Sequence, residues 1–432
     1  MDNVVDLILV YFVAASILAT TWAFLFYVQS WSAPATFFLI VWSAFIVVPI
    51  VFAPHFYLNA AAMFWLLGMA IAWATGAAIG YRTPLGHFRS VGSISLAKRF
   101  STRGTAISVI LSSLVASGVI VMEMQQISTA KIGLSLIRNV EQIARNNATD
   151  RYQGSLNASL FTNLLVASGY FSALLGGLYA AAISREGTKT RSRILISLLP
   201  ILVITVFGVL QNTKASTLYA TVMWVSGFLL VHSGQKARLS SLLKPKTFLI
   251  GAGVFALLLA LFYWMQSTRY SSRELTIKDS YDLLMVYAVG HLGGFSYWFD
   301  HYYISSNYGL GANSFSGLYE SLGLIEKTES PAQLPKPLWG ELETNVDTAF
   351  SELIMDFGIF GSLVVVFTFA AIVTIAHRLF VRGIVYLAPM ISAFYAVTLW
   401  SFTTNLFNYL TIIVALVLFS IYLALARVRW RR

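Results

Sequence analysis

Basic side chains in the polar intervals of this chain have the chemistry to bind a diphosphate. An arginine guanidinium stays charged at physiological pH and binds two phosphate oxygens at once, and a lysine supplies a compact positive charge. Positioned cations also stabilise the charge that develops when a diphosphate leaves. Each could instead pair with a carboxylate nearby in the sequence. The candidates for diphosphate binding are Arg145, Arg151, Lys214 and Arg269, with Arg273 as a further catalytic cation.

The interval from Gln266 to Phe357 is the longest polar stretch of the chain and holds candidates for proton transfer. An unperturbed imidazole titrates near neutral pH, so His291 or His301 could take a proton from a hydroxyl group. Asp347 and Glu274 could do the same, although a single histidine beside aromatic residues is more often structural. Flat aromatic faces suit sugar rings. The candidates for sugar binding are Tyr270, Tyr287, Trp298, Tyr302 and Asn345.

Several classes of protein are disfavoured because their motifs are missing from the sequence. There is no GxxxxGK[ST] loop for ATP, no HExxH for zinc and no GxSxG nucleophile turn. The chain has no cysteine, so it forms neither disulfides nor thiolate metal sites. The acids Glu123, Glu352 and Asp356 all fall near the predicted ends of apolar runs. An ion-coupled transporter would place such groups deeper, and no metal or cofactor is predicted.

The elements that position these residues are predicted to be membrane-spanning helices. The chain has 432 residues, of which 57% are hydrophobic and 11% charged, with a mean hydropathy of +0.72. A soluble domain carries roughly 25% charged residues, so this composition predicts an all-α polytopic membrane protein. About eleven runs are long enough to span a bilayer. They are 7–28, 35–53, 59–80, 106–122, 160–183, 194–211, 216–232, 247–266, 353–376, 384–400 and 406–426.

The basic segments between these runs predict the orientation of the chain. Most Lys and Arg residues fall in 81–105, 184–193, 233–246, 377–383 and 427–432, which contain a single acid, Glu186. If the runs alternate across a bilayer, all five segments lie on one side, which the positive-inside rule identifies as the cytoplasm. The N-terminus is then outside and the C-terminus inside. The net charge of +11 therefore reflects topology and predicts no nucleic-acid partner.

Three domain-like intervals follow from this topology. Residues 1–266 would hold spans one to eight and an outer loop, 123–159, that contains an amphipathic surface helix. Residues 267–352 would form a large outer loop that carries the chemistry. Residues 353–432 would hold the last three spans and a basic cytoplasmic tail.

Within the large outer loop, two stretches have distinct predictions. Residues 281–303 are too apolar for an ordinary surface helix and contain Gly290, Gly293 and Gly294. They predict short interfacial or re-entrant helices, a pair broken at the glycines. Residues 326–340 contain three prolines and predict a loop whose length suits an active-site cover.

Four stretches, taken in order, resemble bacterial oligosaccharide repeat-unit polymerases of the Wzy type, which build O-antigen or capsule. They are the turn at 211–216, the Thr-Arg-Tyr at 268–270, the aromatic and glycine-rich stretch at 287–303, and the entry to the next span at 345–361. In the turn, Lys214 stands where the family usually has arginine. The resemblance covers about 200–370 and leaves the first four spans without a matching motif.

The resemblance implies a GT-C-like fold and a metal-independent glycosyl transfer with inversion. The growing glycan would leave undecaprenyl diphosphate and join a sugar hydroxyl of an incoming lipid-linked repeat unit. It implies an outer-face reaction at the bacterial inner membrane, with the bilayer and both lipid-linked oligosaccharides as partners, and leaves room for a chain-length regulator protein. Arg269 would lead in stabilising the diphosphate, followed by Arg273, Lys214, Arg145 and Arg151.

Two other functions are compatible with the same residues. An O-antigen ligase would use the same lipid donor but transfer the glycan to a lipid A core. A transporter or flippase of lipid-linked sugars would bind the same diphosphate and form no glycosidic bond. The sequence leaves these alternatives open.

Overall fold

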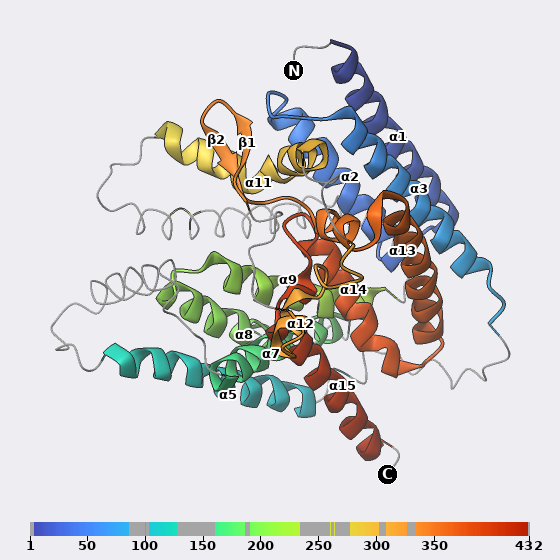
Figure 1. Ribbon diagram of the computed structural model, residues 1–432. Coiled ribbons are helices and arrows are strands. Elements are labelled where there is room, and N and C mark those ends of the chain that lie inside the picture. Colours follow the sequence, from blue (N-terminus) through green and yellow to red (C-terminus); the bar gives the residue numbers. More distant parts are fainter. Residues whose placement is uncertain are drawn as a thin grey trace. The chain divides into compact units, whose positions relative to one another are not determined.

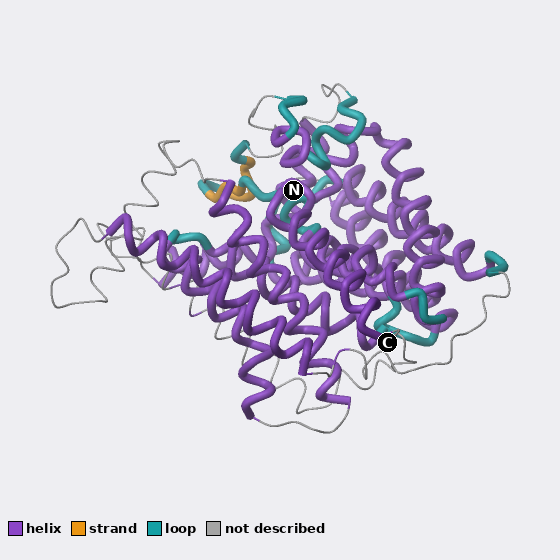
Figure 2. The backbone as a smooth tube through the Cα atoms, turned by 90° about the horizontal axis from the view of Figure 1, so that it is seen from below, coloured by secondary structure: helices purple, strands orange, loops and turns teal. Residues whose placement is uncertain are grey.

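The computed structural model describes residues 4–85, 100, 103–127, 160–185, 191–233, 260, 263, 277–301, 308–325 and 334–430. Among these residues the secondary structure is almost entirely helical, with one short antiparallel hairpin (Figure 2). The chain divides into two compact units. Unit 1 comprises Met1–Val91, Ser233–Ala237 and Lys278–Leu410, and unit 2 comprises Gly92–His232, Arg238–Ile277 and Thr411–Arg432.

Eight helices in the described part of the chain are long and apolar enough to cross a membrane. They are α1 (Val4–Val28), α2 (Pro34–Phe52), α3 (Ala60–Arg82), α5 (Arg103–Ile127), α7 (Leu160–Arg185), α8 (Arg191–Leu210), α9 (Lys214–His232) and α13 (Ala349–Val381). The helices α14 (Ala388–Trp400) and α15 (Leu410–Trp430) are also apolar, but their apolar stretches, Val385–Trp400 and Leu410–Ala426, are shorter. The all-α, multi-pass character is thus confirmed. The predicted run 247–266 lies almost wholly outside the described residues, so the count of eleven stays a prediction.

Helices α3 and α13 of unit 1 run parallel to each other. The Trp65 indole on α3 donates to the carbonyl of Ile359 at 3.2 Å. Further along both helices, the Arg378 guanidinium donates to the carbonyls of Gly80 at 2.6 Å and Thr83 at 2.8 Å. Arg82 and Arg378 therefore lie at the same end of the pair, as the alternating topology requires. The loops that precede α3 and α13 lie at the opposite end.

Helix α11 (Ile277–His301) is continuous, so the predicted pair of short helices broken at glycines is wrong (Figure 1). The glycines serve close packing instead. A Cβ on Gly294 would lie 2.2 Å from the carbonyl oxygen of Val346, and one on Gly293 would lie 2.7 Å from the Leu338 side chain. The helix remains continuous because each glycine inside it costs only a modest amount of stability. The close packing that the glycines permit offsets that cost.

The segment that packs on α11 is a hairpin of β1 (Lys336–Trp339) and β2 (Leu342–Thr344). The predicted loop 326–340 is therefore wrong over β1. Leu338 is the reason, because its buried side chain joins Ala53, Phe56 and Val289 in one hydrophobic cluster. The backbone N–H of Tyr57 also donates to the Leu338 carbonyl at 2.9 Å. The hairpin is thus held by α11 and by the α2–α3 connection.

Helix α13 begins at Ala349, four residues earlier than predicted, because Thr348 caps it. The Thr348 hydroxyl accepts from the backbone N–H of Phe350 at 3.3 Å, which satisfies a free donor of the first turn. The helix is then interrupted at Gly358, where φ is 72° and ψ is 176°. A side chain would be strained in that conformation and would meet the ring of Tyr308. The short helical segment before this kink carries Glu352 and Asp356.

The connection from α14 to α15 contains the 3₁₀ turn η5 (Leu406–Asn408) and lies against the start of α13. The backbone N–H of Ala349 donates to the Ser401 carbonyl at 2.8 Å, and the Trp42 indole donates to the Ser401 hydroxyl at 3.0 Å. Trp42 is buried beside the ring of Phe350, 4.6 Å between centroids. A short helix, α12 (Ser316–Ser321), and the 3₁₀ turn η4 (Val385–Leu387) complete unit 1.

Unit 2 is built around α7, which packs on α5, α8 and α9. Small polar side chains form some of these contacts. The hydroxyls of Ser113 and Ser172 lie 2.9 Å apart, and the indole of Trp224 donates to the Ser197 carbonyl at 2.9 Å. Such bonds suit an apolar setting, where an unpaired polar group is expensive. Most of the predicted site residues that the structure describes lie in unit 1.

Candidate functional site

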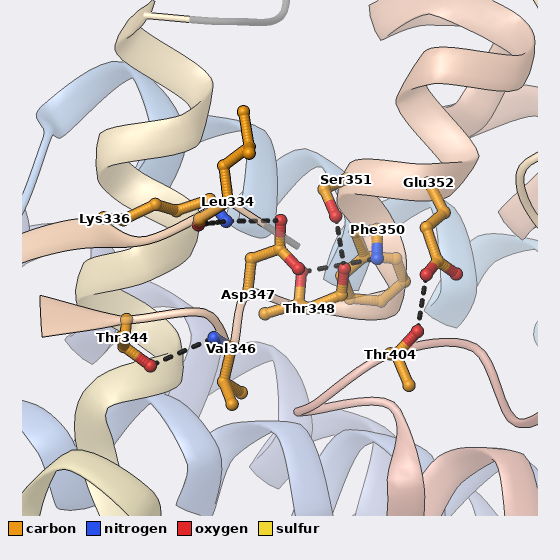
Figure 3. A network of polar contacts seen from close by, with 10 residues as sticks. All are labelled: Leu334, Lys336, Thr344, Val346, Asp347, Thr348, Phe350, Ser351, Glu352 and Thr404. Carbon is orange, nitrogen blue, oxygen red and sulfur yellow. Dashed lines mark hydrogen bonds and ion pairs between the residues drawn. The ribbon is translucent and has the colours of Figure 1, made fainter. Parts of the chain in front are cut away.

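Six polar side chains, four of them buried and two half-buried, lie together where the hairpin, the start of α13 and the 401–408 connection meet. We call them the buried polar cluster, and most of them are drawn in Figure 3. They come from segments that are far apart in sequence and are brought together by the contacts just described. The buried polar cluster consists of Lys336, Asp347, Ser351, Glu352, Thr404 and Asn408.

Lys336 and Asp347 form a buried ion pair in this cluster. The ammonium nitrogen lies 3.6 Å from Oδ2 of Asp347, and the side chains are 0% and 4% exposed. Lys336 also donates to the Leu334 carbonyl at 3.0 Å (Figure 3). The hairpin positions the lysine from β1, while Asp347 stands between β2 and the cap of α13. Removing either partner would leave the other charge buried and uncompensated.

Burial shifts the pKa of Asp347 upward and the pKa of Lys336 downward, so both move toward neutral pH. Burial raises the pKa of Asp347 from 3.8 to about 7, and the positive charge of Lys336 opposes this rise. Burial also lowers the pKa of Lys336, and the charge of Asp347 opposes that change. A carboxyl group whose pKa lies near neutral pH can both accept and release a proton under physiological conditions. Such perturbed groups concentrate at functional sites, although structural ion pairs show them too.

Glu352 and Asp356 are buried carboxylates with a structural role. Glu352 accepts from the hydroxyl of Thr404, from the backbone N–H of Asn405 at 3.0 Å and from the amide of Asn408 at 2.8 Å. Asp356 accepts three bonds from Asn313 and Ser314, at 2.7–3.0 Å. Every oxygen of these two groups is engaged in holding a loop. Oδ2 of Asp347, by contrast, has an ion pair but no hydrogen bond among the described residues.

His291, a predicted catalytic residue, lies in the core of unit 1 at 1% exposure. Its Nε2 is 2.9 Å from the carbonyl oxygen of Phe45, so this nitrogen carries the proton and donates. Its ring lies between those of Phe45 and Phe402, at 5.6 and 5.4 Å. Burial lowers the pKa of His291 to about 4, so the imidazole is neutral at physiological pH. These contacts describe a structural histidine.

The other predicted residues that the structure describes in unit 1 are spread over its surface and core. His301 is exposed and stacks on Tyr297, 4.0 Å between ring centroids. Tyr287 is 44% exposed, and Asn345, directly after β2, is also exposed. Trp298 is completely buried, so in this structure its indole presents no face to a sugar. Of the predicted catalytic residues within the described ranges, only Asp347 joins the buried polar cluster.

Lys214, a predicted diphosphate ligand, is the first residue of α9 in unit 2. The predicted run begins at residue 216, so the helix begins two residues earlier than expected. A helix N-terminus carries a partial positive charge that favours anions. The remaining predicted residues lie outside the described part of the chain. They are Arg145, Arg151, Arg269, Tyr270, Arg273 and Tyr302.

Lys336, Glu352, Thr404 and Asn408 were not predicted as site residues. A signal for the hairpin does exist, because Gly340 starts a two-residue turn between Trp339 and Leu342. Gly340 has φ of 58°, which glycine adopts readily in such turns. Recognising this turn would have placed Lys336 in a strand. No local pattern indicates that Glu352 meets residues 404–408, more than fifty positions away.

In the described ranges, no group of three or more His, Asp and Glu side chains could hold a metal ion. No protein-family model matches the chain, and neither a curated protein nor a solved structure matches it. The site therefore has to be interpreted from its own chemistry.

Proposed function

We propose that this protein polymerises lipid-linked oligosaccharide repeat units at the outer face of a bacterial inner membrane. In this proposal the growing glycan is transferred from undecaprenyl diphosphate to a sugar hydroxyl of the next lipid-linked unit. The observation that carries the proposal is Asp347, a buried carboxyl beside Lys336 whose pKa of about 7 suits a general base. The apolar helices, which suit a lipid-linked substrate, support it further.

The proposed reaction balances without a cofactor. The acceptor hydroxyl oxygen attacks the anomeric carbon, and the bond from that carbon to the diphosphate oxygen breaks. The diphosphate leaves with the bonding electron pair, and the anomeric configuration inverts. The hydroxyl proton passes to the Asp347 carboxylate, while neighbouring Lys336 favours the ionised form that accepts it.

The hairpin acts as a cover in this proposal. Asp347 is 3% exposed beneath β1 and β2, so an acceptor sugar reaches it only when the hairpin moves away from α11. Closure over the bound sugar would exclude water, which would otherwise compete as an acceptor. The diphosphate charge would be stabilised by Arg269, Arg273, Lys214, Arg145 and Arg151, as expected from the sequence.

Elongation by the purified, full-length protein tests the proposal. The protein would be reconstituted in lipid nanodiscs with lipid-linked repeat units, without ATP or an ion gradient. We expect new glycosidic bonds to form, and Asp347→Asn to reduce their rate by about 10²-fold or more, the usual contribution of a general base. Arg269→Ala should abolish long chains and leave single repeat units intact.

Asp282→Asn is a matched control for the base. It removes a half-buried carboxylate of the same outer interval, on α11, without touching the buried polar cluster. Thermal unfolding of each variant would separate a loss of rate from a loss of fold. Normal elongation by a folded Asp347→Asn protein would reject Asp347 as the base. Absence of any new bond with the wild-type protein would reject the polymerase itself.

A transporter of lipid-linked sugars is the second candidate, because buried ionisable groups such as Lys336 and Glu352 also occur in ion-coupled carriers. The bonds that engage both oxygens of Glu352 make it a poor ion relay, which favours the enzyme. A carrier would move the lipid-linked sugar and form no bond in the elongation assay. A ligase is distinguished in cells: loss of a polymerase leaves one repeat on the lipid A core, and loss of a ligase leaves none.

A further inference from the structure

A group of aromatic rings surrounds an exposed carboxylate at the end of unit 1 that carries the hairpin. Its members come from the α2–α3 connection, the last turn of α11 and the tip of the hairpin. None of them except His301 was predicted as a site residue. We call this group the aromatic face, and it consists of His55, Tyr57, Tyr297, Asp300, His301 and Trp339.

The centre of the aromatic face is the pair formed by Tyr57 and Asp300. The Tyr57 hydroxyl donates to Oδ2 of Asp300 at 2.6 Å. Burial and this bond raise the pKa of Tyr57 to about 12, so the phenol keeps its proton and remains the donor. His301, 3.8 Å away, also approaches Oδ2. Both contacts use the same oxygen. Among the described residues this leaves Oδ1 of the carboxylate, which is 43% exposed, to accept other donors.

The rings around this pair are already arranged by packing. Tyr297 and His301 stack at 4.0 Å with an interplanar angle of 14°, and the Tyr57 ring meets Tyr297 at 5.8 Å. Trp339 is 58% exposed at the hairpin tip and packs edge-on against His55 at 4.7 Å. Because these rings are held in place before any ligand binds, little conformational entropy would be lost on binding.

The aromatic face is exposed to water and not to lipid tails. Asp300 and His301 would be expensive in hydrocarbon at more than 40% exposure. The negative charge of Asp300 would also repel phosphates. A ligand for this surface therefore has apolar flat faces and hydroxyl donors and lacks negative charge near Asp300.

Sugar rings have this combination of properties, because their C–H faces pack on aromatic rings while their hydroxyls donate to carboxylates. We infer that the aromatic face is a glycan subsite, at which sugar rings stack on Trp339 and Tyr57 and donate hydroxyls to Asp300. The subsite holds glycan beyond the reacting sugars, away from the diphosphate. The identity of that glycan as the polymer under construction rests on the proposed function, but the sugar-binding chemistry does not.

Direct binding tests the subsite. The full-length protein in nanodiscs would be titrated into fluorescently labelled oligosaccharides, prepared by partial acid hydrolysis of the surface polysaccharide of the cells that encode it. Fluorescence anisotropy reports the affinity. We expect Trp339→Ala to weaken binding about 3- to 10-fold, the range for losing an aromatic contact. Asp300→Asn should weaken it about 10-fold, because a charge-assisted acceptor is lost.

Trp22→Ala is a closely matched control. Trp22 is 57% exposed on α1 and packs edge-on against Phe26 at 5.3 Å, much as Trp339 packs against His55. It lies in an apolar helix, so its loss should leave oligosaccharide affinity unchanged. Equal weakening by Trp22→Ala and Trp339→Ala would overturn the assignment. So would unchanged affinity in both Trp339→Ala and Asp300→Asn, with thermal unfolding confirming that each variant is folded.

The outcome separates the subsite from the proposed function. The oligosaccharide probe carries no lipid and no diphosphate, so its binding is independent of glycosyl transfer. Selective loss of binding in Trp339→Ala, with no elongation by the wild-type protein, would support the subsite and reject the polymerase. Elongation by the wild type, with unchanged oligosaccharide binding in Trp339→Ala and Asp300→Asn, would support the polymerase and reject the subsite.

Discussion

Replacing Lys336 by methionine would leave Asp347 buried without its counter-ion, and the effect on stability should depend on pH. The two charges lie 3.6 Å apart, which corresponds to about 5 kcal/mol of attraction at an effective dielectric constant of ~20. Burial opposes that attraction, because the Asp347 pKa still rises from 3.8 to about 7, a shift worth roughly 4 kcal/mol. In Lys336→Met the pKa rises further, and the carboxyl keeps its proton at neutral pH.

The sign follows from proton binding in the two states. A raised native pKa means that the folded protein binds more protons than the unfolded chain, so its free energy of unfolding falls as pH rises. In the wild type, the Asp347 contribution is present below pH 3.8 and is lost by about pH 7. In Lys336→Met the loss continues above pH 7, at up to ~1.4 kcal/mol per pH unit. The pKa of Lys336 is lowered, so this residue adds stability to the wild type as pH rises toward 10.5. The difference in free energy of unfolding between the wild type and Lys336→Met therefore widens further.

Urea or thermal unfolding of the full-length protein in detergent, at pH 6.0, 7.0 and 8.5, measures this difference. We expect Lys336→Met to be destabilised relative to the wild type by about 2 kcal/mol more at pH 8.5 than at pH 7. The double variant Lys336→Met with Asp347→Asn should lose the extra pH dependence, because neither side chain of the pair can then ionise. A wild-type-to-variant difference that stays constant or narrows with pH would refute the reasoning.

Two further predictions concern packing and loop attachment in unit 1. Gly294→Ala should destabilise the protein by about 1–3 kcal/mol, because its Cβ would meet the Val346 carbonyl at 2.2 Å. Gly68→Ala, whose nearest neighbour would be 3.5 Å away, is the control and should be nearly neutral in the same unfolding assay. Asp356→Ala should cost at least about 2 kcal/mol, because three donors from the 313–314 loop lose their acceptor. Limited proteolysis of the Asp356→Ala variant should cleave the chain near Asn313. A variant as resistant to cleavage there as the wild type would contradict the role of Asp356 in holding the 313–314 loop.

The helices that cross a membrane were predictable because hydropathy is a local property. Each described apolar helix overlaps a predicted run. Arg82 and Arg378 lie at the same end of the α3–α13 pair. This too was predictable, because the basic residues of short loops indicate which side of the membrane each loop occupies. The error at α11 has a physical cause. Gly290, Gly293 and Gly294 look like helix breakers until the hairpin that packs on them is known.

The candidate site was predictable only in part. Asp347 was one of several side chains of the polar interval named as a possible proton acceptor, but its partner Lys336 was not named, because that pairing depends on the fold of the hairpin. The histidine at 291 looked chemically active, and the structure places it in the core, where its Nε2–H donates to the Phe45 carbonyl. Residue type alone does not distinguish these outcomes, because burial and partners decide the protonation state.

The sequence by itself determined that this chain is a multi-pass helical membrane protein, because an apolar run of sufficient length has no other low-energy place than a bilayer. It also determined which intervals are rich in polar chemistry. Only the tertiary structure decided that Asp347 meets Lys336 and that Tyr57 meets Asp300, which are separated by 243 positions. Such contacts form when packed elements bring distant residues together, and no local pattern in the sequence encodes that meeting.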